Sequence, residues 1–180
     1  MDLTAEGIAC RRAGRLVFEG VSLAIRAGEA AVLRGPNGVG KSSLLRVLAG
    51  LSPPAAGTAR LGETPLADAE AWRERVALAG HLDAVKPALT VRENLAAWAE
   101  IFAAPPERVE HALERLALAP LAEDPAAWCS AGQRRRTAIA RLALSNCAVW
   151  ILDEPTAPLD ARSRERLSDL ITDYRAAGGL

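Results

Sequence analysis

The sequence has no excess of charge of either sign, because its 22 Lys and Arg residues equal its 22 Asp and Glu residues. A strongly basic surface that gathers nucleic acid or anionic lipid is therefore not expected, and nucleic acid is not expected as the main partner. The apolar runs are short and interrupted, far below the roughly 20 residues that a membrane-spanning helix needs. We therefore expect no direct insertion into a membrane.

Cysteine is scarce, and its three copies, Cys10, Cys129 and Cys147, have no metal-like spacing. Their odd number leaves at least one thiol unpaired, which is typical of reduced cysteines in the cytosol. The first residues, Met1 to Glu6, are acidic and lack the basic and apolar regions of a signal peptide. We expect a cytosolic location, so that any membrane function would require docking on another chain.

The pattern along the 180 residues predicts one α/β domain with a parallel sheet. Apolar bursts broken by glycines predict an antiparallel β portion at the start, and residues 30–33 read as a short buried strand. A second apolar strand is predicted at 148–152. Caps and apolar periodicity predict helices at 42–51, 90–102, from 106 onward, 134–144 and 162–177. We expect a core of residues 1–81 and 136–180, with a helical subdomain at about 82–135 inserted into it.

A glycine-rich loop lies between the strand at 30–33 and the first helix. It fits the phosphate-loop pattern in full, with the residues Gly35, Pro36, Asn37, Gly38, Val39, Gly40, Lys41 and Ser42, followed by Ser43. In such a loop, backbone N–H groups and the positive end of the helix hold phosphates. We expect Lys41 to reach the β- and γ-phosphates of ATP, and the Ser42 hydroxyl to bind Mg²⁺.

Two adjacent acids, Asp153 and Glu154, end the apolar strand at 148–152. Such a pair is usually a solvated turn, but a phosphate loop upstream favours a catalytic role. The first acid then holds the Mg²⁺ shell, and the second orients and deprotonates the attacking water. We therefore assign Asp153 to the metal and Glu154 to catalysis.

A third motif runs from Cys129 to Gln133 and is followed by three arginines. A turn of small residues that opens a helix forms an anion site from N–H groups and the helix dipole. Taken alone, the pentapeptide is better explained as a helix cap. Since one nucleotide already has its own loop, however, a second anion site suggests the γ-phosphate offered by another subunit.

At these three motifs the sequence resembles the nucleotide-binding subunits of ABC transporters, and the resemblance covers essentially the whole chain. It implies MgATP bound between two copies of the chain, beneath membrane-spanning subunits at the cytoplasmic face of the bacterial inner membrane. It further implies that Ser130 and Gly132, with Gln133 beside them, contact the nucleotide of the opposing subunit. By the same resemblance Asp160 lies at the dimer seam, and His81 takes a catalytic position where most of the family has a glutamine.

Finer cues resemble one branch of that family, the ATP-binding subunit of the haem exporter in cytochrome c biogenesis. The cues are Gly80-His81, Lys86, the stretch from Leu89 to Leu95, the stretch from Ser130 to Arg136, and the stretch from Trp150 to Pro155. Three residues depart from the patterns. Cys129 replaces the usual leucine of the third motif, Ala84 replaces a glycine of the branch, and Pro158 lies in the segment before Asp160.

The chain ends at Leu180, before a further strand and a switch histidine that the family places next. The resemblance therefore implies a truncated form that binds MgATP but hydrolyses it slowly. Two other functions stay open. One is a soluble ABC ATPase of DNA repair or translation, and the other is a structural subunit that binds nucleotide with little hydrolysis.

Overall fold

The computed structural model describes all residues from Met1 to Leu180, and they form two compact units. Unit 1 consists of Met1–Leu78, Cys147–Ile151 and Tyr174–Leu180. Unit 2 consists of Ala79–Asn146 and Leu152–Asp173. No helix in either unit has both the length and the apolar character that crossing a bilayer requires.

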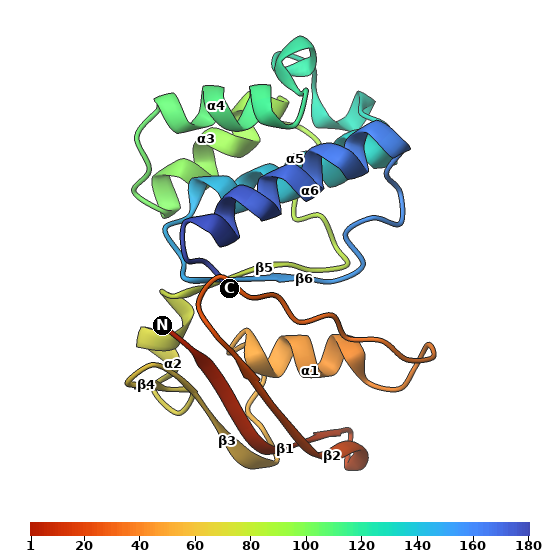
Figure 1. Cartoon of the computed structure of the whole chain (residues 1–180). Helices are drawn as coiled ribbons and strands as arrows, with labels where there is room; N and C mark the ends of the chain where they lie inside the picture. The colour runs from red at the N-terminus through yellow and green to blue at the C-terminus, as the bar shows by residue number, and fades with distance from the viewer. The chain divides into compact units, whose positions relative to one another are not determined.

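Unit 1 is built on a four-stranded antiparallel sheet with the strand order β2-β1-β3-β4 (Figure 1). Its elements are β1 (Leu3–Arg12), β2 (Arg15–Ile25), α1 (Lys41–Leu48), β3 (Ala56–Leu61), β4 (Thr64–Pro65) and α2 (Ala69–Arg73). In the register of β1, Leu3 pairs with Ile25 on one side and with Leu61 on the other. The predicted antiparallel β portion is thereby confirmed.

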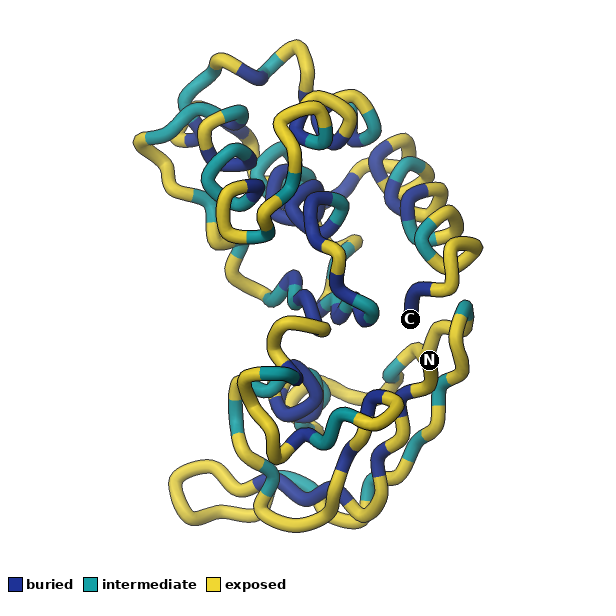
Figure 2. Tube along the Cα trace, turned by 90° about the vertical axis from the view of Figure 1, so that its left-hand side faces the viewer, coloured by how far each residue is buried: buried dark blue, intermediate teal, exposed yellow.

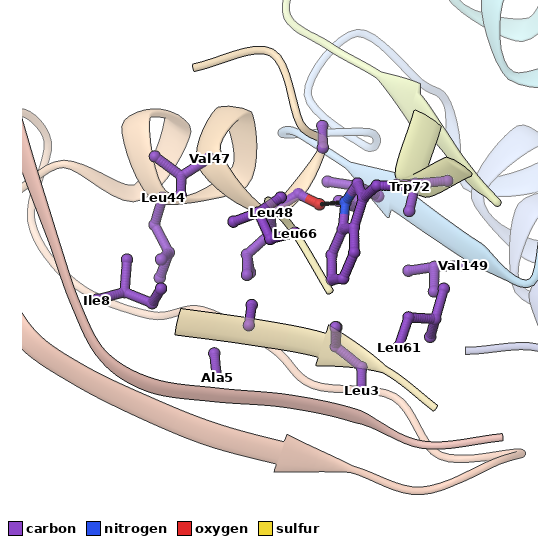
Figure 3. Close-up of a cluster of buried hydrophobic side chains, with 14 of the residues drawn as sticks. Leu3, Ala5, Ile8, Leu44, Val47, Leu48, Leu61, Leu66, Trp72 and Val149 are labelled. Atoms are coloured by element: carbon purple, nitrogen blue, oxygen red, sulfur yellow. Dashed lines mark hydrogen bonds between the residues drawn. The ribbon is translucent and has the colours of Figure 1, made fainter. Parts of the chain in front are cut away.

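The core of unit 1 lies between this sheet and α1 (Figure 3). Leu44 of α1 points toward Ile8 of β1, and both side chains are buried. Trp72 of α2 is fully buried, and its Nε1 donates a hydrogen bond of 2.8 Å to the carbonyl oxygen of Leu48. Because the ring's one polar atom is paired, its burial carries no unsatisfied donor. This packing fixes the helix that follows the phosphate loop.

A second sheet pairs β5 (Val76–Ala79) with β6 (Val149–Leu152). The carbonyl oxygen of Arg75 accepts from the N–H of Val149 at 3.1 Å, and that of Ala79 accepts from the N–H of Asp153 at 2.9 Å. Both partners advance by four residues in the same direction, so the strands are parallel. The parallel sheet of the predicted α/β core is confirmed.

The strand predicted at residues 30–33 is wrong, since these residues have no regular structure and Val32 is 74% exposed. A strand needs a neighbour that supplies backbone hydrogen bonds. The free side of β6 is instead bonded by Leu180, whose N–H donates to Ala148 and whose carbonyl accepts from Trp150. Residues 30–33 therefore belong to neither sheet.

Unit 2 is helical, and its helix starts follow local sequence signals. Its elements are α3 (Val91–Ile101), α4 (Glu107–Arg115), η1 (Ala119–Leu121), η2 (Ala126–Trp128), α5 (Ala131–Ala140), η3 (Arg141–Leu144) and most of α6 (Ala161–Ala176). Thr90 caps α3 by accepting from the N–H of Glu93 at 3.1 Å, and the Glu93 carboxylate accepts from the N–H of Thr90 at 2.8 Å. This capping box is the one that the sequence predicts.

Candidate functional site

The loop that precedes α1 is exposed along most of its length (Figure 2) and is shaped by glycines in left-handed conformations. Gly38 has φ 82° and Gly40 has φ 106°, values that side chains rarely adopt. A Cβ added to Gly40 would lie 2.8 Å from the side chain of Val17 and 2.9 Å from that of Phe18. The loop therefore passes too close to β2 for any other residue at position 40.

The first turn of α1 is open to an anion. No side chain caps this helix, and its first turn contains no acidic residue. Its leading N–H groups are therefore available to phosphate oxygens, and the helix dipole adds partial positive charge. The ammonium group of Lys41 donates to the carbonyl oxygens of Gly35 and Pro36 at 2.8 and 2.9 Å, so it lies over the same loop. Ser42 is exposed beside it.

The remaining residues predicted for the loop differ in their exposure. Asn37 and Val39 are exposed at the tip, while Ser43 is buried inside α1. The arrangement can hold a polyphosphate through main-chain donors and one ammonium group. These residues belong to unit 1, whereas the other predicted site residues belong to unit 2.

In unit 2, Asp153 and Glu154 follow β6 directly. Asp153 is buried, and its N–H is held by the carbonyl oxygen of Ala79. Glu154 is exposed and has φ 46°, a left-handed conformation that costs a non-glycine residue roughly 1 kcal/mol. Strain of this kind is concentrated at functional positions, where the surroundings fix the side chain's direction. No local sequence pattern indicates this backbone conformation.

The third motif forms the start of α5, with Ser130 as its N-cap. The Ser130 hydroxyl accepts from the N–H of Gln133 at 3.2 Å, and the Gln133 side chain accepts from the N–H of Ser130 at 2.6 Å. The helix-cap interpretation is thus confirmed, and it leaves the exposed end of the helix with its partial positive charge. A Cβ on Gly132 would lie 2.9 Å from the carbonyl oxygen of Pro158. The motif and the segment before Asp160 are therefore in close contact.

Asp160 is the N-cap of α6. This structural role is separate from its predicted place at the dimer seam. Its carboxylate accepts from the N–H of Ser163 at 2.7 Å. This hydrogen bond holds the pKa of Asp160 below its usual value. An N-cap signal, Asp followed by a long apolar-periodic segment, was available in the sequence.

His81 is exposed in the segment that follows β5. Nearby, the buried side chain of Asn94 holds this segment's far end, because its Oδ1 accepts from the N–H of Lys86 at 2.7 Å and its Nδ2 donates to the carbonyl of Lys86 at 3.0 Å. Sequence reasoning missed Asn94 as an anchor, since a single Asn within a helix carries no distinctive local pattern. His81 and Asp153 follow paired strands, so both lie at the carboxyl end of the same two-stranded sheet.

The three departures from the resembled patterns each have a local explanation. Cys129 is buried where a leucine is usual, and its burial raises the pKa of its thiol, so it packs as a neutral group. Ala84 has φ 52°, which explains why the branch has a glycine there. The carbonyl oxygen of Pro158 packs against Gly132, where a Cβ would lie only 2.9 Å from it.

No group of three or more His, Cys, Asp or Glu side chains is arranged to hold a metal ion. Mg²⁺ in nucleotide sites does not need such a cage, because one or two protein oxygens, phosphates and waters complete its shell. The hydroxyl of Ser42 and the carboxylate of Asp153 are hard oxygen donors of this kind. Their chemistry fits Mg²⁺ better than it fits a softer metal.

Comparison with known proteins identifies the family. The ABC transporter family model matches residues 18–157. The cytochrome c biogenesis ATP-binding export protein CcmA of Paramagnetospirillum magneticum is 50% identical, over 98% of this chain and 84% of its own length. The chain belongs to the ABC transporter family. Within this family it groups with the CcmA proteins, since the CcmA of Rhodospirillum rubrum is also 49% identical, over 97% of this chain and 76% of its own length.

Solved structures of ABC proteins share the fold. An ABC transporter ATP-binding protein from Pyrococcus furiosus superposes with a TM-score of 0.87 at 22% identity, over 99% of this chain and 88% of that one. A dimeric ATP-binding cassette in a post-hydrolysis state, bound to ADP and phosphate, superposes with a TM-score of 0.86 at 22% identity, over 98% and 84%. The predicted phosphate-loop NTPase fold is confirmed, and the ABC family makes the chain a nucleotide-binding ATPase subunit.

Proposed function

We propose that the chain is the ATP-hydrolysing subunit of an exporter that acts in c-type cytochrome biogenesis, with haem as the cargo that the branch resemblance implies. The observation that carries the proposal is the 50% identity to an export protein of that process, together with the complete phosphate loop before α1. The similarity to these export proteins supports a role in cytochrome c biogenesis, and the site residues support ATP hydrolysis.

In the proposed reaction, Lys41 and the leading N–H groups of α1 bind the β- and γ-phosphates of ATP. By the family pattern Ser42 and Asp153 would hold Mg²⁺, which would neutralise charge on the phosphates. Glu154 accepts a proton from the attacking water, and its left-handed backbone sets the direction of the carboxylate. His81, exposed after β5, assists in placing that water.

The proposed complex contains two copies of the chain, each of which offers the start of its α5 to the nucleotide of the other. Ser130 is exposed at the positive end of this helix, and Gly132 and Gln133 lie in its first turn. An end of this kind stabilises added negative charge on a phosphate. Asp160 is proposed to lie near the interface between the two copies, because the segment just before it contacts Gly132 through the carbonyl oxygen of Pro158.

Docking to membrane-spanning subunits is proposed to use the helical part of unit 2, at the cytoplasmic face of the bacterial inner membrane. Three of the four large apolar side chains that are more than half exposed lie in unit 2, namely Leu82 (82%), Ile101 (68%) and Trp128 (78%). We propose these three side chains as contacts with the membrane-spanning subunits. The chain's balanced charge gives no reason for direct binding to lipid.

The test is the oligomeric state of the Glu154→Gln protein with and without MgATP. The amide cannot accept the proton of water, so ATP persists and the two copies stay together. Size-exclusion chromatography with light scattering should show a dimer with MgATP and a monomer with EDTA. Adding Ser130→Arg should abolish the dimer, because the long side chain would collide with the second nucleotide. A monomer under all conditions would contradict the two-copy proposal.

A further inference from the structure

One arginine of α5 contacts the carboxyl ends of both parallel strands. Arg135 lies five residues after Ser130 and is 3% exposed. Its Nη1 donates to the carbonyl oxygen of Gly80 at 2.6 Å, directly after β5, and its Nη2 donates to the carbonyl oxygen of Asp153, directly after β6. A single planar guanidinium thus joins α5 to two segments 55 and 18 residues away.

The same head group also forms an ion pair with Asp83, in the segment that contains His81. Nη1 of Arg135 lies 3.2 Å from Oδ1 of Asp83, whose side chain is 27% exposed. The Nε of Arg135 is buried without a hydrogen-bond partner. A guanidinium with an unmatched donor is a costly way to fill a core, so its presence calls for a role that an apolar side chain would not perform.

We propose that Arg135 is a positioning residue for hydrolysis, which fixes Asp153 and the His81 segment to the helix that begins at Ser130. The proposal rests on the function assigned above, in which Ser130 meets the second nucleotide. Because α5 is a continuous helix, a shift of its first turn moves the guanidinium and both carbonyl groups that it bonds. Contact between a phosphate and the first turn of α5 would thereby change the positions of Asp153, the proposed Mg²⁺ ligand, and of Glu154 beside it.

The neighbouring Arg136 of α5 makes different contacts, so it provides a control. Nη1 of Arg136 donates to the carbonyl oxygens of Leu116 and Ala117 at 2.8 and 3.0 Å, at the end of α4. Arg136 therefore ties α5 to another helix and touches neither Asp153 nor the segment after β5. Arg136→Gln removes the same charge and the same number of carbonyl contacts as Arg135→Gln, one position further along the helix.

The first measurement needs neither metal nor nucleotide. Hydrogen exchange should speed up at residues 80–83 and 153–154 in Arg135→Gln, at least 10-fold relative to wild type, and stay unchanged there in Arg136→Gln. Equal exchange at these residues in both variants and in wild type would overturn the proposal. So would faster exchange there in Arg136→Gln of the same size as in Arg135→Gln.

The second measurement separates binding from turnover. The ATP dissociation constant in EDTA, set by the phosphate loop, should change less than about 3-fold in Arg135→Gln. The kcat for MgATP should fall about 30- to 100-fold, since displacement of a catalytic group by about 1 Å has effects of this order. The Mg²⁺ concentration for half-maximal activity should rise several-fold, while Arg136→Gln keeps wild-type values. Wild-type kcat and Mg²⁺ dependence in a folded Arg135→Gln protein would contradict the proposal.

Arg135→Lys decides the matter if Arg135→Gln does not fold. Lysine keeps the charge near Asp83 but lacks the planar fork that reaches both carbonyl groups, so kcat should fall with the Mg²⁺ requirement raised. Wild-type values for Arg135→Lys would overturn the proposal. Failure of the Glu154→Gln protein to dimerise would instead remove the second copy and leave these single-chain measurements as they are, so the two failures are distinguishable.

Discussion

Lys41 bonds the carbonyl oxygens of Gly35 and Pro36, six and five residues away, whereas Arg135 bonds carbonyl groups 55 and 18 residues away. The phosphate loop of unit 1 is thus shaped by its own residues, with left-handed glycines and one helix start. The segments of unit 2 that contain Asp153 and His81 are instead held by tertiary contacts with the buried side chain of Arg135. The two regions therefore depend on different kinds of structure, one on local and one on long-range hydrogen bonds.

This difference predicts how each region responds to change. Removal of an exposed side chain of the loop, such as that of Lys41, should alter nucleotide affinity and leave the rest of the chain folded, because this side chain bonds only the loop itself. A substitution at the contacts of unit 2 should alter turnover more than affinity.

Lys41→Ala should weaken ATP binding at least about 30-fold, which corresponds to roughly 2 kcal/mol or more for the loss of a charge-assisted bond to phosphate. The melting temperature should change little, since the Lys41 ammonium bonds only the exposed loop. Isothermal titration calorimetry with ATP provides the measurement. Lys86→Ala, which removes the chain's other lysine, is the control and should bind ATP normally. An unchanged dissociation constant in Lys41→Ala would remove the phosphate-loop assignment.

Gly40→Ala should destabilise the chain more than Gly38→Ala does. Both glycines are left-handed, but only Gly40 has side-chain atoms within 3.0 Å of the added Cβ, those of Val17 and Phe18. Backbone strain alone costs about 1 kcal/mol, and overpacking adds about 1–2 kcal/mol. Urea unfolding of the two variants measures the difference. Equal free energies of unfolding would show that the loop does not pack against β2 as described.

Ala84→Gly should raise the free energy of unfolding by about 0.5 kcal/mol. Glycine relieves the left-handed strain at φ 52°, although it also increases the entropy of the unfolded chain. Ala88→Gly, in the same segment without a positive φ, should instead lower it. Thermal unfolding of both variants checks the prediction, and a loss of stability in Ala84→Gly would count against the described backbone.

The smallest effect concerns the pH dependence contributed by Asp160. The N–H of Ser163 keeps the pKa of this carboxylate below its usual value, so its ionised form stabilises the folded chain above about pH 4. This contribution is lost as pH falls through the lowered folded pKa. Asp160→Ala should therefore lower the unfolding midpoint at pH 7, and the difference from wild type should shrink toward pH 3. A difference that grows on acidification would have the wrong sign.

The sequence predicted features whose signals are local. The capping box of Thr90 and Glu93, the break at Pro106 and the loop before α1 depend on short patterns, and each is found in its predicted place. The strand at residues 30–33 was mispredicted, because apolar composition cannot supply a pairing neighbour. In the sequence, Arg135 is one of three consecutive arginines. Its partners are distant in sequence, so no local pattern distinguishes it from Arg136.

ATP binding and single-turnover hydrolysis should be compared in Glu154→Gln and wild type, because binding is assigned to the loop of unit 1 and proton abstraction to Glu154. Glu154→Gln should bind MgATP within about 3-fold of wild type and hydrolyse it at least about 100-fold more slowly, since loss of a positioned general base has effects of this order. Hydrolysis by Glu154→Gln at the wild-type rate would contradict the assignment of Glu154 as the general base.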